Sequence, residues 1–204
     1  MSLSTDSSDT DRLLHRVAAG DRGAMELLMT RHREYLRQVI DARMEPRLRQ
    51  KLDPSDVVQE TLTVVSQRID DYVARQPASF RLWLRSTAIE QLINARRRHR
   101  AQKRSFERDV RISDVSSLAI AKAFVAKGPS ERMLRREVMG QVREALSELT
   151  EADRDILVMR HAEGLSNAEV AELLELAPKT ASKRYGRALQ RLAVQLAKLG
   201  YSRP

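Results

Sequence analysis

The 204-residue sequence has no cysteine, which excludes disulfide bonds and metal sites built from thiolates. Aromatic residues make up only 4% of the chain, which has 7 glycines and 6 prolines, so the composition favours a helical protein with modest cores. No apolar run approaches the roughly 18 residues of a membrane span. The polar, acidic start, MSLSTDSSDTD, is unlike a signal peptide. We therefore expect a cytoplasmic protein with no membrane contact.

Positive charge is present in excess. The formal net charge is +9 and the isoelectric point is near 10.3, which favours a polyanionic partner, with nucleic acid as the default candidate. The four histidines are scattered along the chain, and no glycine-rich phosphate loop is present. We therefore expect no catalytic centre, no bound metal and no cofactor.

Helical spacing of apolar residues covers most of the chain, and it predicts an all-α fold of two small helical domains joined by a flexible linker. The expected parts are a disordered N-terminus at 1–9, a first domain at 10–104, a linker at 105–130 and a second domain at 131–204. Within the first domain, helices are expected at 11–19, 22–44, 53–69 and 80–98, with a loop at 70–79.

A helix-turn-helix is predicted between Gly164 and Leu192. Ser166 and Glu169 have the spacing of a capping box, which starts the first helix, and Pro178 suits the first turn of the second helix. On a helical projection, one face of that second helix is apolar: Ala181, Tyr185, Ala188, Leu189, Leu192 and Leu196. The other face is cationic: Lys179, Thr180, Lys183, Arg184, Arg187 and Arg191. This pattern suits a helix that reads the DNA major groove, although a solvated basic face is the plainer alternative.

Two helices of the first domain also separate polar from apolar residues. In the helix that Asp53 and Pro54 begin, the polar face is Asp56, Gln59, Glu60 and Thr63, and by itself it favours a merely solvated surface. In the helix at 80–98, Leu84, Ala88, Ile89, Leu92 and Ile93 lie opposite Trp83, Thr87, Glu90, Gln91 and Asn94. Trp83 is open to two interpretations: packing against a neighbouring helix, or stacking on an unpaired base. The basic run at 96–108 that follows is typical of a phosphate-binding segment or of a solvated one.

Three segments in this order and spacing resemble bacterial sigma factors of the short, two-domain extracytoplasmic-function group. They are Asp56-Val-Val-Gln59-Glu60, the helix starting Phe80-Arg-Leu-Trp83-Leu84 with its basic tail, and Leu149-Thr-Glu-Ala-Asp153-Arg-Asp-Ile-Leu followed by the Gly164-Leu-Ser helix-turn-helix. The resemblance covers about 11–104 and 136–196.

This resemblance implies a role for each surface. Contact with the clamp coiled coil of the largest RNA polymerase subunit is implied for Asp56, Gln59, Glu60 and Thr63. Melting and reading of the promoter −10 element is implied for Tyr72, Arg75, Trp83, Thr87, Glu90, Gln91, Asn94, Arg97 and Arg98. Reading of the −35 element is implied for Lys179, Thr180, Ser182, Lys183, Arg184 and Arg187.

Four departures from the family pattern mean that the promoter sequence does not follow from the resemblance. Glu90 stands where family members often have asparagine, and Glu175 replaces the usual glycine of the turn. Lys179-Thr180-Ala181 replaces the usual Gly-Thr-Val at the start of the recognition helix, and Ser182 occupies a commonly basic position. A carboxylate at Glu90 would repel phosphate or accept a hydrogen bond from a cytosine amino group.

The function implied by the resemblance is non-catalytic: the chain would bind core RNA polymerase and direct it to promoter DNA. A monomer is expected for the free protein, and an anti-sigma factor is a further candidate partner. Two rivals remain open at this point. One is a dimeric helix-turn-helix repressor or activator that needs no polymerase, and the other is a nucleic-acid-processing enzyme, which the lack of a carboxylate or histidine cluster disfavours.

Overall fold

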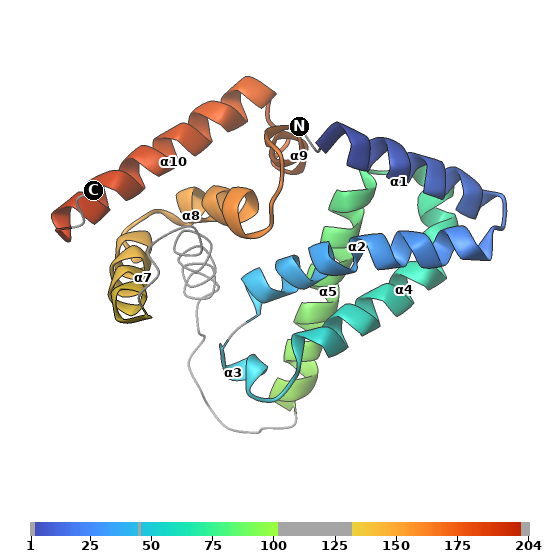
Figure 1. Cartoon of the computed structure of the whole chain (residues 1–204), viewed down its shortest axis with the longest axis horizontal. Helices are drawn as coiled ribbons and strands as arrows, with labels where there is room; N and C mark the ends of the chain where they lie inside the picture. The colour runs from blue at the N-terminus through green and yellow to red at the C-terminus, as the bar shows by residue number, and fades with distance from the viewer. Residues whose placement is uncertain (1–2, 45, 102–131, 201–204) are drawn as a thin grey trace. The chain divides into compact units, whose positions relative to one another are not determined.

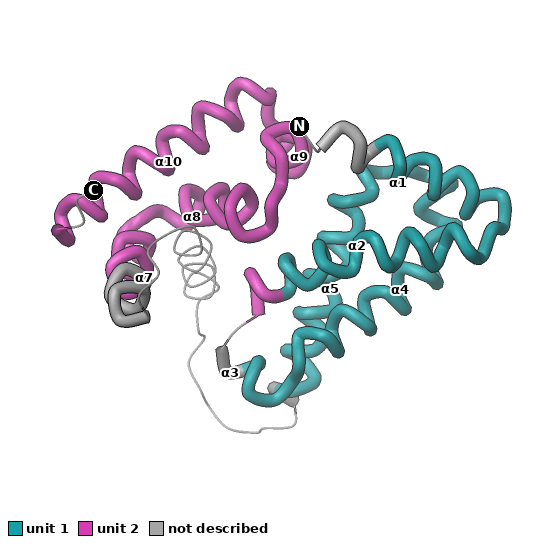
Figure 2. The backbone as a smooth tube through the Cα atoms, in the orientation of Figure 1, with its two compact units in different colours: residues 1–40, 48–104 teal, residues 41–47, 105–204 magenta. Residues whose placement is uncertain are grey.

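The computed structural model describes residues 3–44, 46–101 and 132–200, and every regular element in these ranges is helical (Figure 1). Two compact units are present (Figure 2): residues 1–40 with 48–104, and residues 41–47 with 105–204. The expected linker at 105–130 lies outside the described residues. None of the described helices combines the length and the apolar character that a bilayer-spanning segment needs.

The first unit is built mainly from α1 (Leu3–Ala18), α2 (Arg22–Arg43), α3 (Pro46–Arg49), α4 (Pro54–Arg75) and α5 (Phe80–Ala101); the last residues of α2 and the first of α3 are grouped with the second unit. Of the range 1–9 that was expected to be disordered, residues 3–9 belong to α1, and residues 1–2 lie outside the described residues. Thr10 of α1 is buried, and its hydroxyl lies 3.2 Å from Nε2 of His32 on α2. Helix α1 is thus held against α2 by a buried polar contact that the polar N-terminal sequence did not suggest.

Helix α4 begins as its sequence predicts and ends later. The carboxylate of Asp53 accepts a hydrogen bond from the Ser55 amide at 2.7 Å, and Pro54 occupies the first turn, where its missing N–H costs nothing. The helix then continues to Arg75 and ends at Gln76, whose φ of +39° is left-handed. Residues 70–75 are therefore helical, which corrects the predicted loop at 70–79. The reason is Tyr72, which continues the buried stripe of α4 by one more turn.

Helix α5 packs against α4 and is buried on more sides than the sequence suggests. Thr87 and Gln91, which were placed on the polar, DNA-facing side, are only 4% and 8% exposed, whereas Ile93 of the expected apolar side is 44% exposed. The projection of α5 into one apolar and one polar face was therefore wrong for these three residues. A helix with little amphipathic contrast does not reveal its buried face through periodicity alone.

The second unit is built from α7 (Arg132–Ser147), α8 (Glu151–Leu157), the π-helix η1 (Val158–Ala162), α9 (Asn167–Leu173) and α10 (Pro178–Lys198). Helix α10 packs on α7, α8 and α9. Thr150 caps α8 by accepting from the Asp153 amide, and the predicted capping box of Ser166 and Glu169 is present at the start of α9. The helix-turn-helix is therefore confirmed as a fold element.

The turn between α9 and α10 depends on Glu175. Its φ of +53° is left-handed, and the Leu176 amide bonds the Ala171 carbonyl at 2.9 Å while the Glu175 amide bonds the Glu172 carbonyl at 3.2 Å. This is the Schellman arrangement, which normally uses glycine at the left-handed position because a side chain is disfavoured there. The departure noted in the sequence at Glu175 thus falls on a backbone position that favours glycine.

Candidate functional site

The surfaces singled out in the sequence lie on α4, α5 and α10, and each is described within its own unit. The α4 polar face consists of Asp56, Gln59, Glu60 and Thr63. Asp56, Gln59 and Thr63 are exposed and Glu60 is half-buried, while Val57, Val58, Leu62 and Val65 on the opposite side enter the core. The structure therefore brings the four predicted residues together on one accessible helix face.

Basic side chains of neighbouring helices reach the α4 polar face. Arg98 of α5 donates to the Glu60 carboxylate at 2.6 Å, and Arg33 of α2 donates to the Gln59 side-chain oxygen at 3.2 Å. The Thr63 hydroxyl donates to the backbone carbonyl of Gln59. The acidic character of this face is thus balanced partly within the unit. The sequence did not indicate that Arg33 lies at this face, because its proximity to Gln59 depends on how α2 packs.

Asp53, the N-cap residue of α4, has a carboxyl group whose pKa is lowered. The Ser55 amide and then the Ser55 hydroxyl hold the pKa of the Asp53 carboxyl below its usual range, because both stabilise the ionised form. Asp53 therefore stays charged at neutral pH at the positive end of the helix dipole.

Aromatic side chains gather where α4 meets α5. The rings of Tyr72 and Trp83 are stacked, with centroids 4.6 Å apart, and Phe80 lies 5.7 Å from Trp83 and 5.2 Å from Tyr72. Tyr72 is 5% exposed and its hydroxyl donates to the Ala78 carbonyl, whereas Trp83 remains half-buried. One ring face of Trp83 thus packs inside the unit, and the indole still reaches the surface.

The other residues predicted for the −10 element divide into buried and accessible groups. Thr87 is buried and donates to the Trp83 carbonyl at 3.0 Å, and Gln91 is buried as well. Glu90 is exposed and forms an ion pair with Arg68 of α4 at 3.2 Å. The remaining four lie at the surface, Asn94 half-buried and Arg75, Arg97 and Arg98 exposed. The accessible part of this surface is therefore Trp83 with Glu90, Asn94 and the three arginines.

Helix α10 presents a cationic outer face. Lys179, Thr180, Ser182, Lys183 and Arg187 are exposed, whereas Ala181, Ala188 and Leu192 are buried. Arg191, placed on the same face in the projection, instead donates to the Asp153 carboxylate at 2.5 Å and so binds the scaffold. In the first three turns of the helix, the predicted separation of a buried apolar side from an exposed basic side holds for every residue placed on either side except Arg184 and Tyr185, which are half-buried.

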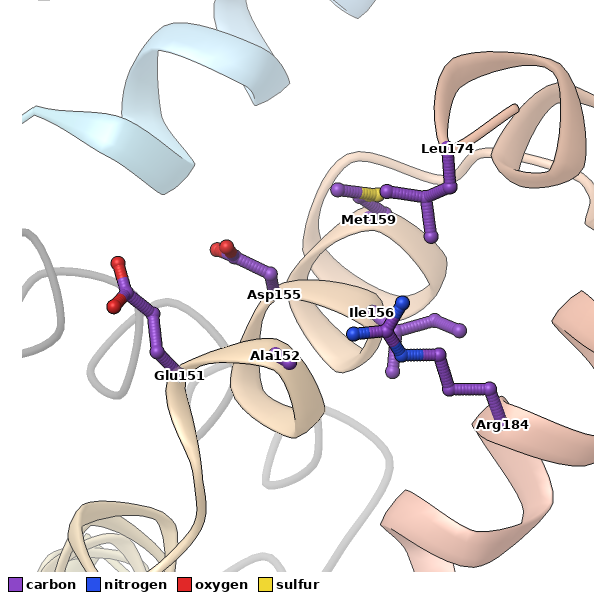
Figure 3. A pocket seen from close by; sticks show the side chains of 7 residues that line it. All are labelled: Glu151, Ala152, Asp155, Ile156, Met159, Leu174 and Arg184. Atoms are coloured by element: carbon purple, nitrogen blue, oxygen red, sulfur yellow. The ribbon is translucent and has the colours of Figure 1, made fainter. Parts of the chain in front are cut away.

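Arg184 differs from its neighbours because it is half-buried and lines a pocket of about 320 Å³. Its side chain reaches from α10 toward Ile156 of α8 (Figure 3). The other lining residues are Glu151, Ala152, Asp155, Met159 and Leu174. No sequence signal marked this pocket, because its walls come from α8, η1, α10 and the residue that follows α9.

Across residues 3–44, 46–101 and 132–200, no three side chains of histidine, aspartate or glutamate come together in a group that could hold a metal ion. The accessible side chains on the described surfaces include lysines, arginines, carboxylates and the indole of Trp83, and such side chains suit recognition of DNA and protein.

Comparison with known families identifies both units. Residues 28–102 match the family model of Sigma-70 region 2, and residues 139–192 match that of Sigma-70, region 4. The chain belongs to the sigma-70 family of RNA polymerase sigma factors. With regions 2 and 4 as its two units, this sigma factor has the two-domain architecture of the extracytoplasmic-function group.

Two curated relatives are similar to this chain along nearly their whole length. The RNA polymerase sigma factor CnrH of Cupriavidus metallidurans is 29% identical over 189 residues, 92% of this chain and 95% of the relative. The RNA polymerase sigma factor NccH of Alcaligenes xylosoxydans xylosoxydans is 26% identical over 193 residues, 94% of this chain and 97% of the relative.

A solved structure of a sigma factor has a similar fold. The structure of CnrH in complex with the cytosolic domain of CnrY matches with a TM-score of 0.56 at 23% identity and covers 93% of this chain and 98% of that chain. The predicted family and the predicted all-α fold are therefore confirmed. The chain is a sigma factor for transcription initiation, and the roles of its individual surfaces remain predictions.

Proposed function

We propose that this sigma factor binds core RNA polymerase through the α4 polar face, melts and reads the −10 element with the exposed part of α5, and reads the −35 element with the outer face of α10. The observation that carries the proposal is the division of α10 into an exposed cationic side and a buried alanine and leucine side. Exposed lysine and arginine on one helix side suit phosphate and base contacts in a major groove.

Two weak DNA contacts on one chain support each other when their spacing matches the promoter. The second contact then becomes intramolecular, so affinity rises without any new interaction. The chain itself acts non-catalytically in this proposal, by positioning the polymerase. A free monomer is expected, because each DNA element is read by a separate unit and no two-fold-related copy is needed.

The clamp coiled coil of the largest polymerase subunit is the proposed partner of Asp56, Gln59, Glu60 and Thr63. Their exposure supports this assignment, since an accessible polar helix face can meet a partner without unfolding of the unit. Arg98 and Arg33 hold Glu60 and Gln59 in place, which lowers the entropy lost when a partner binds.

An anti-sigma factor is the proposed second protein partner, by analogy with CnrH, whose solved structure holds the cytosolic domain of CnrY. The test is to purify the chain from its native host, identify stoichiometric partners, and add each purified partner to a transcription reaction. A partner that lowers promoter-dependent RNA synthesis by this sigma factor supports the assignment. A partner that leaves RNA synthesis unchanged contradicts it.

Transcription in vitro tests the proposal as a whole. Purified chain and purified core polymerase are combined on a library of genomic DNA fragments, and the RNA 5′ ends are sequenced. Discrete start sites that share two upstream elements at constant spacing are expected, and core polymerase alone should yield none. Tight, salt-sensitive binding of the isolated chain to a palindrome, without polymerase, would instead support the repressor or activator.

A further inference from the structure

The first half of α10 is attached to the rest of its unit by little apolar surface. Among residues 178–188 the buried side chains are Ala181 and Ala188 only, and Leu192 is the first larger buried side chain of the helix. Stabilisation by apolar burial scales with the area removed from water, so two alanines contribute little. Other contacts therefore contribute to the orientation of the part of α10 that carries Lys183 and Arg187.

Polar side chains make such contacts at the first turn of this segment and at Tyr185. The Asn167 side chain of α9 donates to the Pro178 carbonyl at 2.9 Å, which holds the first turn. Seven residues further on, the Tyr185 hydroxyl lies 2.9 Å from Nε2 of His161 in a hydrogen bond. The guanidinium of Arg160 lies 5.3 Å from the centroid of the Tyr185 ring, within the range of a cation–π contact.

Both partners of Tyr185 come from the π-helix η1. A π-helical turn carries an extra residue compared with an α-helical turn, so it changes the direction of the side chains that follow it. Arg160 also donates to the Leu165 carbonyl, next to the N-cap residue Ser166 of α9. Residues of η1 thus contact both the entry of the helix-turn-helix and the middle of its second helix.

We propose that His161 and Tyr185 are positioning residues for −35 recognition, a proposal that rests on the proposed −35 role of α10. Their hydrogen bond sets the rotation of α10 about its own axis and so the direction in which Lys183 and Arg187 leave the helix. Hydrogen bonds to base edges require a defined geometry, whereas flexible cations reach phosphates from many angles. Loss of the bond therefore lowers discrimination between DNA sequences more than it lowers overall DNA affinity.

The test uses holoenzyme assembled from core polymerase and the full chain carrying Tyr185→Phe or His161→Ala. The probes are a duplex of the strongest promoter from the genomic library and a duplex of equal length with its −35 region scrambled. Discrimination is the ratio of the two Kd values. The net free energy of one hydrogen bond corresponds to about a two- to tenfold change in an equilibrium constant. In each variant the ratio of the two Kd values should therefore fall by about two- to tenfold.

Three controls separate positioning from general damage. Kd for the scrambled duplex and its salt dependence should change less than about twofold, because the phosphate contacts remain. Gln190→Ala, at an exposed position of the same helix, should keep full discrimination. His161→Gln, which can still bond the Tyr185 hydroxyl, should recover at least half of the discrimination that His161→Ala loses.

A double-variant cycle completes the test. Tyr185→Phe with His161→Ala should be no worse than the more affected single variant, because both remove the same bond. Full discrimination in both single variants, or losses that add in the double variant, would overturn the positioning role alone. A wild-type holoenzyme that does not distinguish the scrambled −35 region would overturn the proposed −35 function, and the positioning role with it.

Discussion

The guanidinium of Arg98 on α5 donates to the carboxylate of Glu60 on α4 at 2.6 Å, so a residue proposed to meet DNA binds one proposed to meet polymerase. Both side chains are substantially exposed, at 55% and 40%. Ion pairs with this exposure contribute about 0–1 kcal/mol to stability. Variants of either residue should therefore stay folded, and their effects can be assigned to binding.

Reversing charge on the α4 polar face should strongly weaken the association with polymerase. Asp56→Arg and Glu60→Arg each place a cation on the proposed coiled-coil contact, and Glu60→Arg also sets two arginines side by side. We expect at least a tenfold weaker Kd for core polymerase, measured by fluorescence anisotropy of labelled chain.

The matched control is Asp71→Arg, which reverses an exposed acidic residue of the same helix eight residues beyond Thr63, the last residue of the α4 polar face. It should keep the wild-type Kd. Unchanged polymerase binding in both Asp56→Arg and Glu60→Arg would show that this face is only a solvated surface.

Removing a cation from the outer face of α10 should weaken promoter binding without affecting polymerase. Lys183→Ala and Arg187→Ala each remove one positive charge from the proposed DNA-contacting face, so the slope of log K against log salt should become shallower by up to about 1. The measurement is a salt titration of holoenzyme on promoter duplex, with polymerase affinity measured in parallel.

Arg191→Ala removes an arginine from the same helix with a different expected result. Arg191 bonds Asp153, whose side chain is only 5% exposed, so its loss leaves a buried carboxylate without this partner and costs about 1–2 kcal/mol of stability. The salt slope should stay at the wild-type value. Equal slope changes in all three variants would show that the α10 cations act through net charge only.

Trp83→Ala distinguishes the two interpretations of the indole. Loss of the ring stacked on Tyr72 should lower the unfolding free energy by about 1–3 kcal/mol. At a temperature where the variant is folded, promoter opening should fall more than about tenfold if the indole also stacks on an unpaired base. Permanganate reactivity of thymines in the −10 region measures the opening.

Phe80→Leu is the control for stability, because Phe80 belongs to the same aromatic cluster but is 4% exposed. Phe80→Leu should lower the unfolding free energy by about 1–2 kcal/mol and leave promoter opening unchanged. Wild-type opening by Trp83→Ala would mean that the indole serves packing only.

Glu175→Gly should stabilise the helix-turn-helix. The left-handed φ of +53° costs a residue with a side chain about 1 kcal/mol relative to glycine, so relief of this strain should raise the unfolding free energy by a similar amount. Chemical denaturation measures the change. Glu175→Ala separates backbone strain from charge: it removes the carboxylate and keeps the strain, so it should not stabilise.

The stability that the N-cap residue Asp53 gives to α4 should depend on pH. The pKa of Asp53 is lowered in the folded protein, first by the Ser55 amide and then by the Ser55 hydroxyl. The stability that ionised Asp53 adds to the folded protein is therefore fully present above the unfolded pKa of about 4. The contribution is lost as pH falls through the lower folded pKa. Asp53→Asn keeps an uncharged cap and lacks this titration. The difference in thermal midpoint between wild type and Asp53→Asn should therefore shrink below pH 4, and a constant difference would contradict the assignment.

Much of the fold follows from local patterns in the chain. Asp53 with Pro54, Thr150 with Asp153, and Ser166 with Glu169 start helices through contacts within a few residues, so their positions could be predicted before any packing was known. The family resemblance likewise depends on motifs and their spacing. These features are local because a cap or a turn is satisfied by its own neighbours.

The sequence by itself determined the helical class, the two parts of the chain, the helix-turn-helix and the cationic side of its second helix. Only the tertiary structure decided that Thr87 and Gln91 are buried, that Arg98 meets Glu60, and that Tyr185 bonds His161. The reason is that helical periodicity specifies which residues share a face, whereas the neighbour that each face meets depends on packing between helices far apart in the chain.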